Sequence, residues 1–279
     1  MNIWYRICEF LPFEMLQWDF MKNALLAIIL IAPLLGLAST MIVTGRMSFF
    51  SDALGHSAFT GIAIGAICGI ATPTWVAVLF SLIFALLFSF VRSKSDQAAD
   101  TLIGVFSSTA VALGIFIATL DGGSFTKYNK YLIGDVLSVT PTEIGILAIV
   151  LICVFVYWVL GSNRLILCSL HPQLASSRGI NIHATQTIFT AIISIIVTLS
   201  ISWVGLLILN SLLVLPAASS RNIAKNMMQY HLFSVLIALV AGITGLIISY
   251  TLGASAGAAI SLVLAAIFLV SFLLRKVRS

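Results

Sequence analysis

The stretch from residue 23 to residue 43, NALLAIILIAPLLGLASTMIV, decides the fold, because it runs for 21 residues without a charged side chain. A helix needs about 20 mainly apolar residues to cross the hydrocarbon core of a bilayer. The stretch also lacks the alternation of polar and apolar residues that a transmembrane strand needs. We therefore predict that it crosses a membrane as a helix.

Similar apolar runs, separated by short polar breaks, continue to residue 274. The candidate spans are 23–43, 53–71, 74–91, 101–120, 143–161, 185–202, 204–219, 231–250 and 253–274. Residues 202–205 form either a tight turn between two spans or a break within a re-entrant pair, so eight and nine crossings both fit. We expect an all-α, polytopic transmembrane helical bundle, with the permeation domain at residues 23–274.

Composition supports this class of fold. Of the 279 residues, 61% are hydrophobic and 8% are charged, whereas soluble proteins carry about 25% charged residues. The net charge of +5 comes from basic residues scattered between apolar runs, so we expect lipid and not nucleic acid as a partner. The four cysteines lie far apart and form no CxxC pair, which indicates neither a disulfide framework nor a zinc cluster.

The placement of Lys and Arg predicts the topology. With nine spans and an external N-terminus, ten of the fourteen basic residues fall on the inside, as the positive-inside rule requires. The basic tail at 275–279 is then cytoplasmic. Residues 1–22 are rich in aromatic residues and carry acidic ones, so they predict an interfacial amphipathic segment and not a cleavable signal peptide.

The expected cytoplasmic segment 163–183 is too long for a simple connection between helices. Pro172 suits the first turn of a helix and Gly179 suits a C-cap. A short helix on the cytoplasmic face is what a membrane subunit would offer to a soluble partner. An ordinary interfacial loop helix is the alternative.

Asp52 and His56 are rare ionisable residues at the start of an expected span. Four residues apart on a helix, they share a face and reach a common ligand. A carboxylate beside an imidazole suits Mn²⁺, Fe²⁺ or Zn²⁺, and two ligands bind weakly enough for transport. Alternatively, Asp52 caps the helix and His56 donates to a neighbouring carbonyl.

A second polar feature surrounds Pro216, which breaks the hydrogen-bond ladder of an apolar run. Asn210 and Ser211 either satisfy the freed backbone or line a pathway, and a kink that serves packing alone is the alternative. Outside the membrane, Asp121 and Asp135 either attract cations or a delivery protein, or belong to a solvated loop.

Residues 46–58, RMSFFSDALGHSA, resemble the R-x-S-F-x-x-D-A-L-x-H-A signature of the manganese/zinc/iron ABC importer permeases. Three further stretches match that family in the same order: 103–114 (IGVFSSTAVALG), 131–138 (YLIGDVLS) and 204–221. Agreement in several ordered places over nearly the whole chain makes this resemblance more specific than one motif.

The resemblance implies a homodimeric or paired permease, containing a second copy or a paralogue, in the bacterial inner membrane. It implies two cytoplasmic ATP-binding subunits and an extracytoplasmic metal-binding lipoprotein as partners. Asp52 and His56 become pathway or gating residues for Mn, Zn or Fe. The family's coupling helix for the ATPase falls on His171, Pro172, Gln173, Ala175 and Gly179. His171 and Gln173 replace an Asp and a Glu there, so we expect a less acidic ATPase contact.

The sequence has no G-x-x-x-x-G-K-[ST] motif, so we expect no permanent cofactor, no enzymatic activity, and ATP hydrolysis on the partner. The expected mechanism is alternating access driven through 163–183. Rivals are a siderophore or vitamin ABC permease, an ATP-independent secondary transporter or channel, and an intramembrane enzyme. The last is disfavoured because the spans hold neither paired Asp residues nor an HExxH motif.

Overall fold

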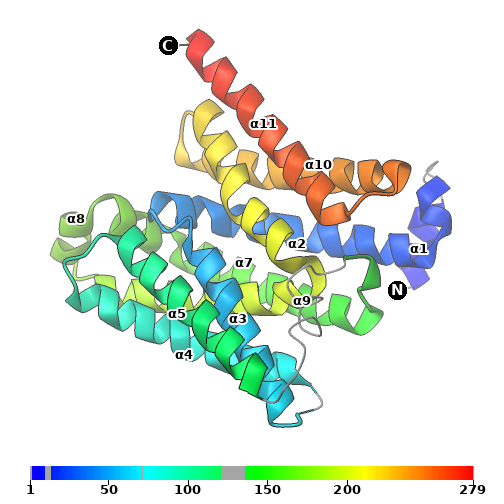
Figure 1. Cartoon of the computed structure of the whole chain (residues 1–279). Coiled ribbons are helices and arrows are strands. Elements are labelled where there is room, and N and C mark those ends of the chain that lie inside the picture. Colours follow the sequence, from blue (N-terminus) through cyan, green and yellow to red (C-terminus); the bar gives the residue numbers. More distant parts are fainter. Residues whose placement is uncertain (1, 10–13, 71, 121–135, 279) are drawn as a thin grey trace. The chain divides into compact units, whose positions relative to one another are not determined.

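The computed structural model describes residues 2–9, 14–70, 72–120 and 136–278, and the regular elements over those residues are all helices (Figure 1). In chain order they are α1 (Asn2–Glu9), η1 (Glu14–Gln17), α2 (Asp19–Thr44), α3 (Phe50–Ile67), α4 (Pro73–Lys94), α5 (Ala99–Leu120), η2 (Val136–Ser138), α7 (Pro141–Leu170), α8 (Pro172–Ser177), α9 (Ile182–Ile223), α10 (Met227–Leu252) and α11 (Ala256–Arg278). The prediction of an all-α fold is confirmed.

Eight helical segments among the described residues are long and apolar enough to cross a membrane. They are α2, α4, α5, α7, α10, α11 and the two halves of α9, Ile182–Ile201 and Val204–Ile223. Helix α3 is not among them, although the expected span 53–71 falls largely on it. Asp52, His56 and several Ser, Thr and Gly residues lower the hydropathy of α3 below that of the eight spans. Eight is the lower of the two predicted numbers, and each half of α9 contributes one of the eight.

The break predicted at residues 202–205 lies inside α9. Gly205 has φ 81° and ψ 161°, a backbone conformation that a side chain would strain, while helical residues continue on both sides. The sequence left open a tight turn between two spans and a break within a re-entrant pair. The structure has a kink at Gly205 between two helical halves that are each long and apolar enough to be a span, and a re-entrant pair stays a prediction. Pro216 lies a few turns further along the same helix.

The chain divides into two compact units, which we describe separately. The first comprises Met1–Thr40, Asp135–Val156 and Ser211–Ser279. In it, α2 packs against α10 through small residues, since a Cβ built on Gly242 would lie 2.6 Å from Ile28 Cγ2. A Cβ on Gly245 would lie 2.6 Å from the Cα of Ile260, so α10 also approaches α11 closely. These glycines serve helix packing within the chain.

Helix α1 is tied to the start of α2 in the same unit. The Trp4 indole donates a hydrogen bond to the Lys22 carbonyl at 2.9 Å, and the Tyr5 hydroxyl donates to Asn23 Oδ1 at 2.9 Å. Residues 14–17 form the short helix η1 between them. That residues 1–22 lie in a membrane interface stays a prediction.

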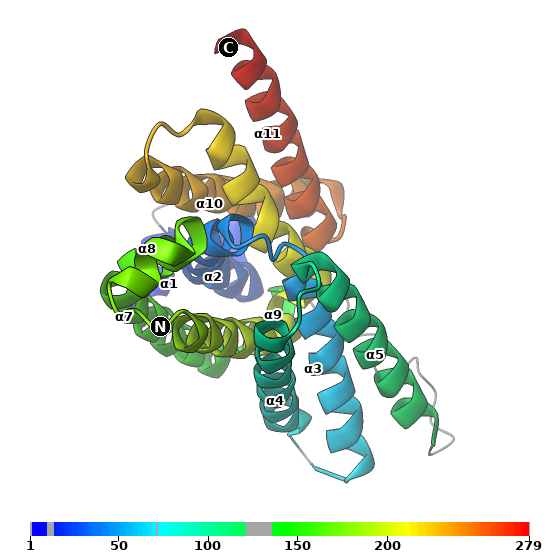
Figure 2. The ribbon, with the colours of Figure 1, turned by 90° about the vertical axis from the view of Figure 1, so that its left-hand side faces the viewer.

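The second unit comprises Met41–Gly134 and Tyr157–Asn210, and α3 packs there against both α4 and α5 (Figures 1 and 2). The Ser57 hydroxyl donates to Ser81 Oγ on α4 at 3.0 Å, and the Thr60 hydroxyl donates to the Ala110 carbonyl on α5 at 2.7 Å. A Cβ on Gly61 would lie 2.5 Å from the Cα of Ala77, so α3 and α4 touch backbone to backbone.

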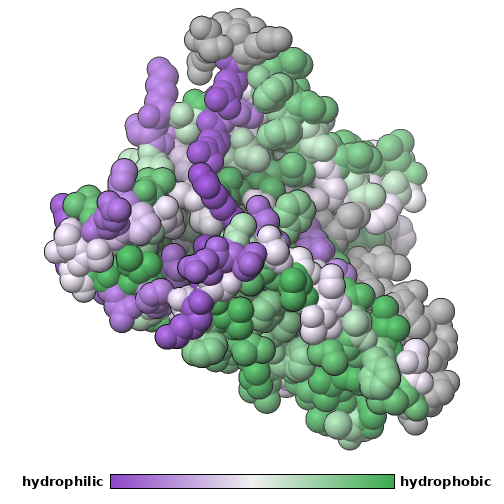
Figure 3. Space-filling model, turned by 60° about the vertical axis from the view of Figure 1, so that its left-hand side comes forward, coloured by the Kyte–Doolittle hydropathy of each residue, from purple (hydrophilic) through white to green (hydrophobic). Residues whose placement is uncertain are grey.

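Large apolar side chains remain exposed on several of the long helices. On α4 they recur at Trp75, Leu79, Ile83, Leu87 and Phe90, which at helical spacing form one stripe. Figure 3 shows apolar side chains over much of the visible surface, with hydrophilic ones gathered in restricted bands. A surface of this kind is expected where helices face lipid.

Candidate metal site

The site begins at a turn that ends α2 and starts α3. Arg46 has φ 54°, the left-handed conformation that glycine usually takes at a helix end. Behind it, the Met47 amide donates to the Ile42 carbonyl at 2.9 Å, which closes a Schellman-type cap. This turn ends α2 and leads into the first turns of α3, which carry Asp52 and His56.

Asp52 and His56 lie on one face of α3, as their spacing predicts. His56 Nε2 lies 3.4 Å from Asp52 Oδ2, and the side chains are 27% and 41% exposed, respectively. The pair is thus partly covered but reachable. A carboxylate and an imidazole in this geometry attract one another when the imidazole is protonated, and can share a cation when it is neutral.

Asn210, on α9, completes the cluster from a distant part of the sequence. Its side-chain Nδ2 donates to Asp52 Oδ1 at 3.0 Å. Its Oδ1 is buried and accepts no hydrogen bond from the part of the chain that the structure describes. Carboxylate, imidazole and amide therefore meet from two helices, and the amide holds an unused oxygen donor.

The hydrogen bonds differ from those of the capping alternative. Phe49 occupies the N-cap position of α3, and no described side chain caps that end. Asp52 instead faces His56 with one oxygen and Asn210 with the other. Among the described residues no group of three or more His, Cys, Asp and Glu side chains is placed to hold a metal ion. Asp52, His56 and Asn210 provide a sparse set of mixed oxygen and nitrogen donors, which suits loose binding.

Of the other residues expected at the pathway, Ser211 and Pro216 belong to the first unit, and their role in the pathway stays a prediction. Ser211 donates to Ser261 Oγ on α11 at 2.8 Å, within the first unit, and Pro216 lies further along α9 in that unit. Asp135, and Asp121 with it, lie outside the described residues. The sequence named Asn210 but gave no signal that it pairs with Asp52, because 158 residues separate them.

The short helix predicted within residues 163–183 is present as α8, and its role in coupling to an ATPase stays a prediction. His171 is its N-cap residue and Pro172 its first residue, and Ala175 is buried. The helix ends at Ser177, and Gly179 follows with φ 73°, so the glycine allows the left-handed turn that the sequence predicted. The side chains of His171 and Gln173 are exposed, which leaves the outer face of α8 free to contact another molecule.

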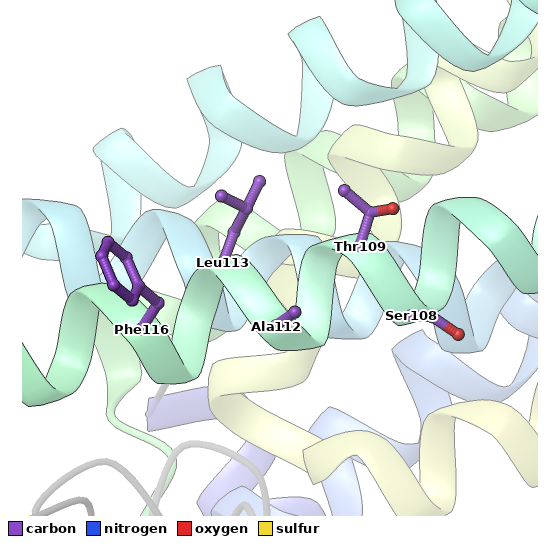
Figure 4. Close-up of a pocket in the computed structure, with 5 residues that line it drawn as sticks. All are labelled: Ser108, Thr109, Ala112, Leu113 and Phe116. Atoms are coloured by element: carbon purple, nitrogen blue, oxygen red, sulfur yellow. The ribbon is translucent and has the colours of Figure 1, made fainter.

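An open hollow of about 560 Å³ lies along α5 in the second unit (Figure 4). The residues that line it all belong to α5: Ser108, Thr109, Ala112, Leu113 and Phe116. None of these side chains is ionisable, so the hollow is distinct in its chemistry from the Asp52 cluster.

The sequence profile of the ABC 3 transport family matches residues 17–275. The chain belongs to this family. The chain is also similar to transport proteins of several bacteria. The chain is 28% identical to the high-affinity zinc uptake system membrane protein ZnuB of Haemophilus influenzae, over 93% of this chain and 99% of that protein. It is 29% identical to the manganese import system permease protein ScaB of Streptococcus gordonii, over 92% and 91%.

A solved structure has the same fold as this ABC 3 chain. PsaBC from Streptococcus pneumoniae, determined in complex with a Fab, matches with a TM-score of 0.80 and 25% identity. The match covers 98% of this chain and 95% of that one. The chain is therefore a multi-pass membrane protein with the architecture of a family of transport permeases.

Proposed function

We propose that the chain is the membrane-spanning subunit of an ATP-driven importer of a divalent metal ion, manganese or zinc. The observation that carries the proposal is the cluster of Asp52, His56 and Asn210, which offers mixed oxygen and nitrogen donors inside a family of transport subunits. The names of the relatives point to these two metals. Iron, which the same donors suit, is the third ion to assay.

The geometry fits an ion that stays only briefly. Two strong donors and one amide bind a divalent ion more weakly than a closed four-ligand site, so release needs little rearrangement. A partly hydrated ion then moves on when the helices shift between outward-open and inward-open states. Asn210 holds Asp52 in place until the ion replaces the hydrogen bond, and rotation of its amide presents Oδ1 as a further ligand.

ATP is used by separate cytoplasmic subunits that dock on α8. The helix offers an exposed apolar residue, Leu174, directly after the exposed polar residue Gln173. An extracytoplasmic metal-binding protein delivers the ion at the opposite side. The protein lies in the bacterial inner membrane, with its basic C-terminus in the cytoplasm, because that orientation places most Lys and Arg residues inside.

A second copy of the chain, or a paralogue, packs on α5. Supporting this, the exposed face of α5 carries Thr101, Gly104, Ser108 and Ala112, whereas exposed positions on α4 carry large apolar residues such as Ile83. Small and hydroxyl side chains let membrane helices approach closely. In a variant without native cysteines, Ser108→Cys should form a disulfide-linked dimer and Leu79→Cys on α4 should not.

The transport proposal is tested by radioactive manganese and zinc uptake into cells that express the chain with its ATP-binding subunit and binding protein. Asp52→Asn and His56→Gln should each lower uptake by about tenfold or more, because each removes a donor of the sparse site. The matched controls are Asp100→Asn and His183→Gln, which change exposed residues at helix starts. Normal uptake by both site variants would refute the assignment.

The rival functions give different outcomes in the same cells. A secondary transporter or channel would continue to take up metal when the ATP-binding subunit carries a substitution that abolishes hydrolysis. A permease for siderophores or vitamins would take up a bulky chelate and would tolerate loss of Asp52 or His56. We expect uptake of the free ion only, and only with an active ATPase.

A further inference from the structure

A stripe of hydroxyl side chains runs along one face of the first half of α9. Thr187, Thr190, Ser194 and Thr198 follow one another at intervals of three or four residues, so they share a face at 3.6 residues per turn. All four belong to the second unit, which also contains α3 and α4. The stripe therefore lies in the unit that holds Asp52 and His56.

Two contacts fix the direction in which this stripe faces. Near its start, Thr187 Oγ1 lies 2.6 Å from Ser89 Oγ on α4. Near its end, Ile201 continues the same face, and its Cδ1 would lie 3.5 Å from a Cβ on Gly55 of α3. Gly55 is the residue before His56. Ser194 and Thr198 lie between these two contacts, on the side of α9 that faces α3 and α4.

Ser194 and Thr198 are buried without hydrogen bonds. The two residues are 0% and 1% exposed, and neither hydroxyl has a partner among the described residues. Hydroxyls in helices usually bond to a carbonyl one turn back, as Thr190 does with the Thr187 carbonyl at 2.9 Å. Burying an unpaired hydroxyl lowers stability, so two of them one turn apart call for a ligand.

The chemistry of the pair fits a hydrated cation. Neutral hydroxyl oxygens coordinate a hard divalent ion weakly or accept hydrogen bonds from its water shell. Four residues along a helix separate the two oxygens by about 6 Å, a distance that a partly hydrated ion spans. Because neither group is charged, the ion would bind there only weakly. Weak binding lets the ion leave easily, as a site that follows the charged one must allow.

We propose that Ser194 and Thr198 form a second, uncharged cation site that receives the partly hydrated divalent ion when it leaves Asp52 and His56. This inference rests on the proposed transport function. Thr190 and Thr187 continue the stripe towards the start of α9, but their hydroxyls are already hydrogen-bonded and take no part in the site. The ion thus moves from the charged cluster to the oxygens of Ser194 and Thr198, on the face that α9 turns towards α3 and α4.

The test is manganese uptake by the assembled transporter with the double variant Ser194→Ala, Thr198→Val. The maximal rate should fall by about tenfold or more, while the external concentration giving half-maximal uptake stays unchanged, since entry and delivery are untouched. The thermal stability of the purified complex should be equal or higher, because the variant removes two unpaired buried hydroxyls.

Two further variants keep the result decisive. Thr198→Ser retains a hydroxyl and should transport as the wild type does. Thr190→Val removes a hydroxyl that is already bonded within its helix, and it should change the rate by less than about twofold. If Thr190→Val lowers uptake as much as the double variant, or if the double variant transports normally, the site does not exist.

Asp52→Asn, measured in parallel, separates this inference from the function on which it rests. Loss of uptake in Asp52→Asn with a normal rate in the double variant overturns the second site alone. Normal uptake in Asp52→Asn overturns both. A double variant that is less stable yet transports normally per folded molecule indicates that the hydroxyls hold only structural water, which also refutes the proposal.

Discussion

Helices α3 and α4 lie against each other in the same unit, yet they differ in burial and composition. Thirteen of the eighteen residues of α3 are buried, whereas six of the 22 residues of α4 are. Helix α3 carries Asp52, His56 and several Gly, Ser and Thr residues, while α4 exposes a stripe of Leu, Ile, Phe and Trp side chains. The polar helix is covered by protein and the apolar one is left open.

This difference shows how the chain partly covers the ionisable groups of α3 with protein. Lipid offers no partners for a carboxylate, so a helix that carries one must be surrounded by other helices. Small residues where the helices meet, Gly61 of α3 and Gly114 of α5, let α4 and α5 come close enough to do so. Helix α4 needs no such cover from neighbouring helices, because its outward-facing side chains are as apolar as the lipid.

The largest expected effect is at the contact between the two helices. Gly61→Ala places a Cβ 2.5 Å from the Cα of Ala77, which is backbone and cannot move aside alone. Overpacking of this kind costs about 1–3 kcal/mol or more, so the yield and thermal stability of the purified protein should fall. Gly145→Ala on α7, where nothing lies within 4 Å, is the matched control and should be neutral or slightly stabilising. Equal stability of the two variants would contradict the close contact of α3 and α4.

A smaller effect is expected where α9 reaches the polar face of α3. Asn210→Leu removes the hydrogen bond to Asp52 and the amide oxygen, so metal uptake should fall by about fivefold to tenfold. Stability should change little, because the variant also removes a buried oxygen that has no described partner. Ser211→Ala, at the neighbouring position on α9, loses a bond to Ser261 and should leave uptake within about twofold of the wild type. If Ser211→Ala lowers uptake more than Asn210→Leu, the polar side of α3 is not where the ion passes.

Much of this architecture follows from the sequence because lipid imposes a strong constraint. A helix that faces lipid must be apolar for about 20 residues, so α2, α4, α5, α7, α10 and α11 are each found at a predicted span. Helix α8 was also predicted, because Pro172 and Gly179 mark its limits by local backbone chemistry. These features depend only on residues that are close together in the sequence.

The remaining features depend on residues far apart in the chain. Helix α3 is too polar to qualify as a span by hydropathy, and only its packing against α4 and α5 explains why it is stable there. The pairing of Asn210 with Asp52 joins positions 158 residues apart and leaves no local signal. The unpaired hydroxyls of Ser194 and Thr198 are likewise invisible in the sequence, because most hydroxyls on helices bond to their own backbone.

The smallest expected effect comes from removing one methylene group from an isoleucine on each of the two helices, α3 and α4. Ile62 on α3 is 4% exposed, whereas Ile83 on α4 is 56% exposed. Ile62→Val should lower the free energy of unfolding by about 0.5–1.5 kcal/mol, because protein surrounds the lost methyl and leaves a small cavity. Ile83→Val should change it by less than about 0.5 kcal/mol, since lipid or detergent fills the space. Thermal unfolding of both variants in one detergent measures the difference, and a cost at Ile83 equal to that at Ile62 would mean that protein, and not lipid, covers the outer stripe of α4.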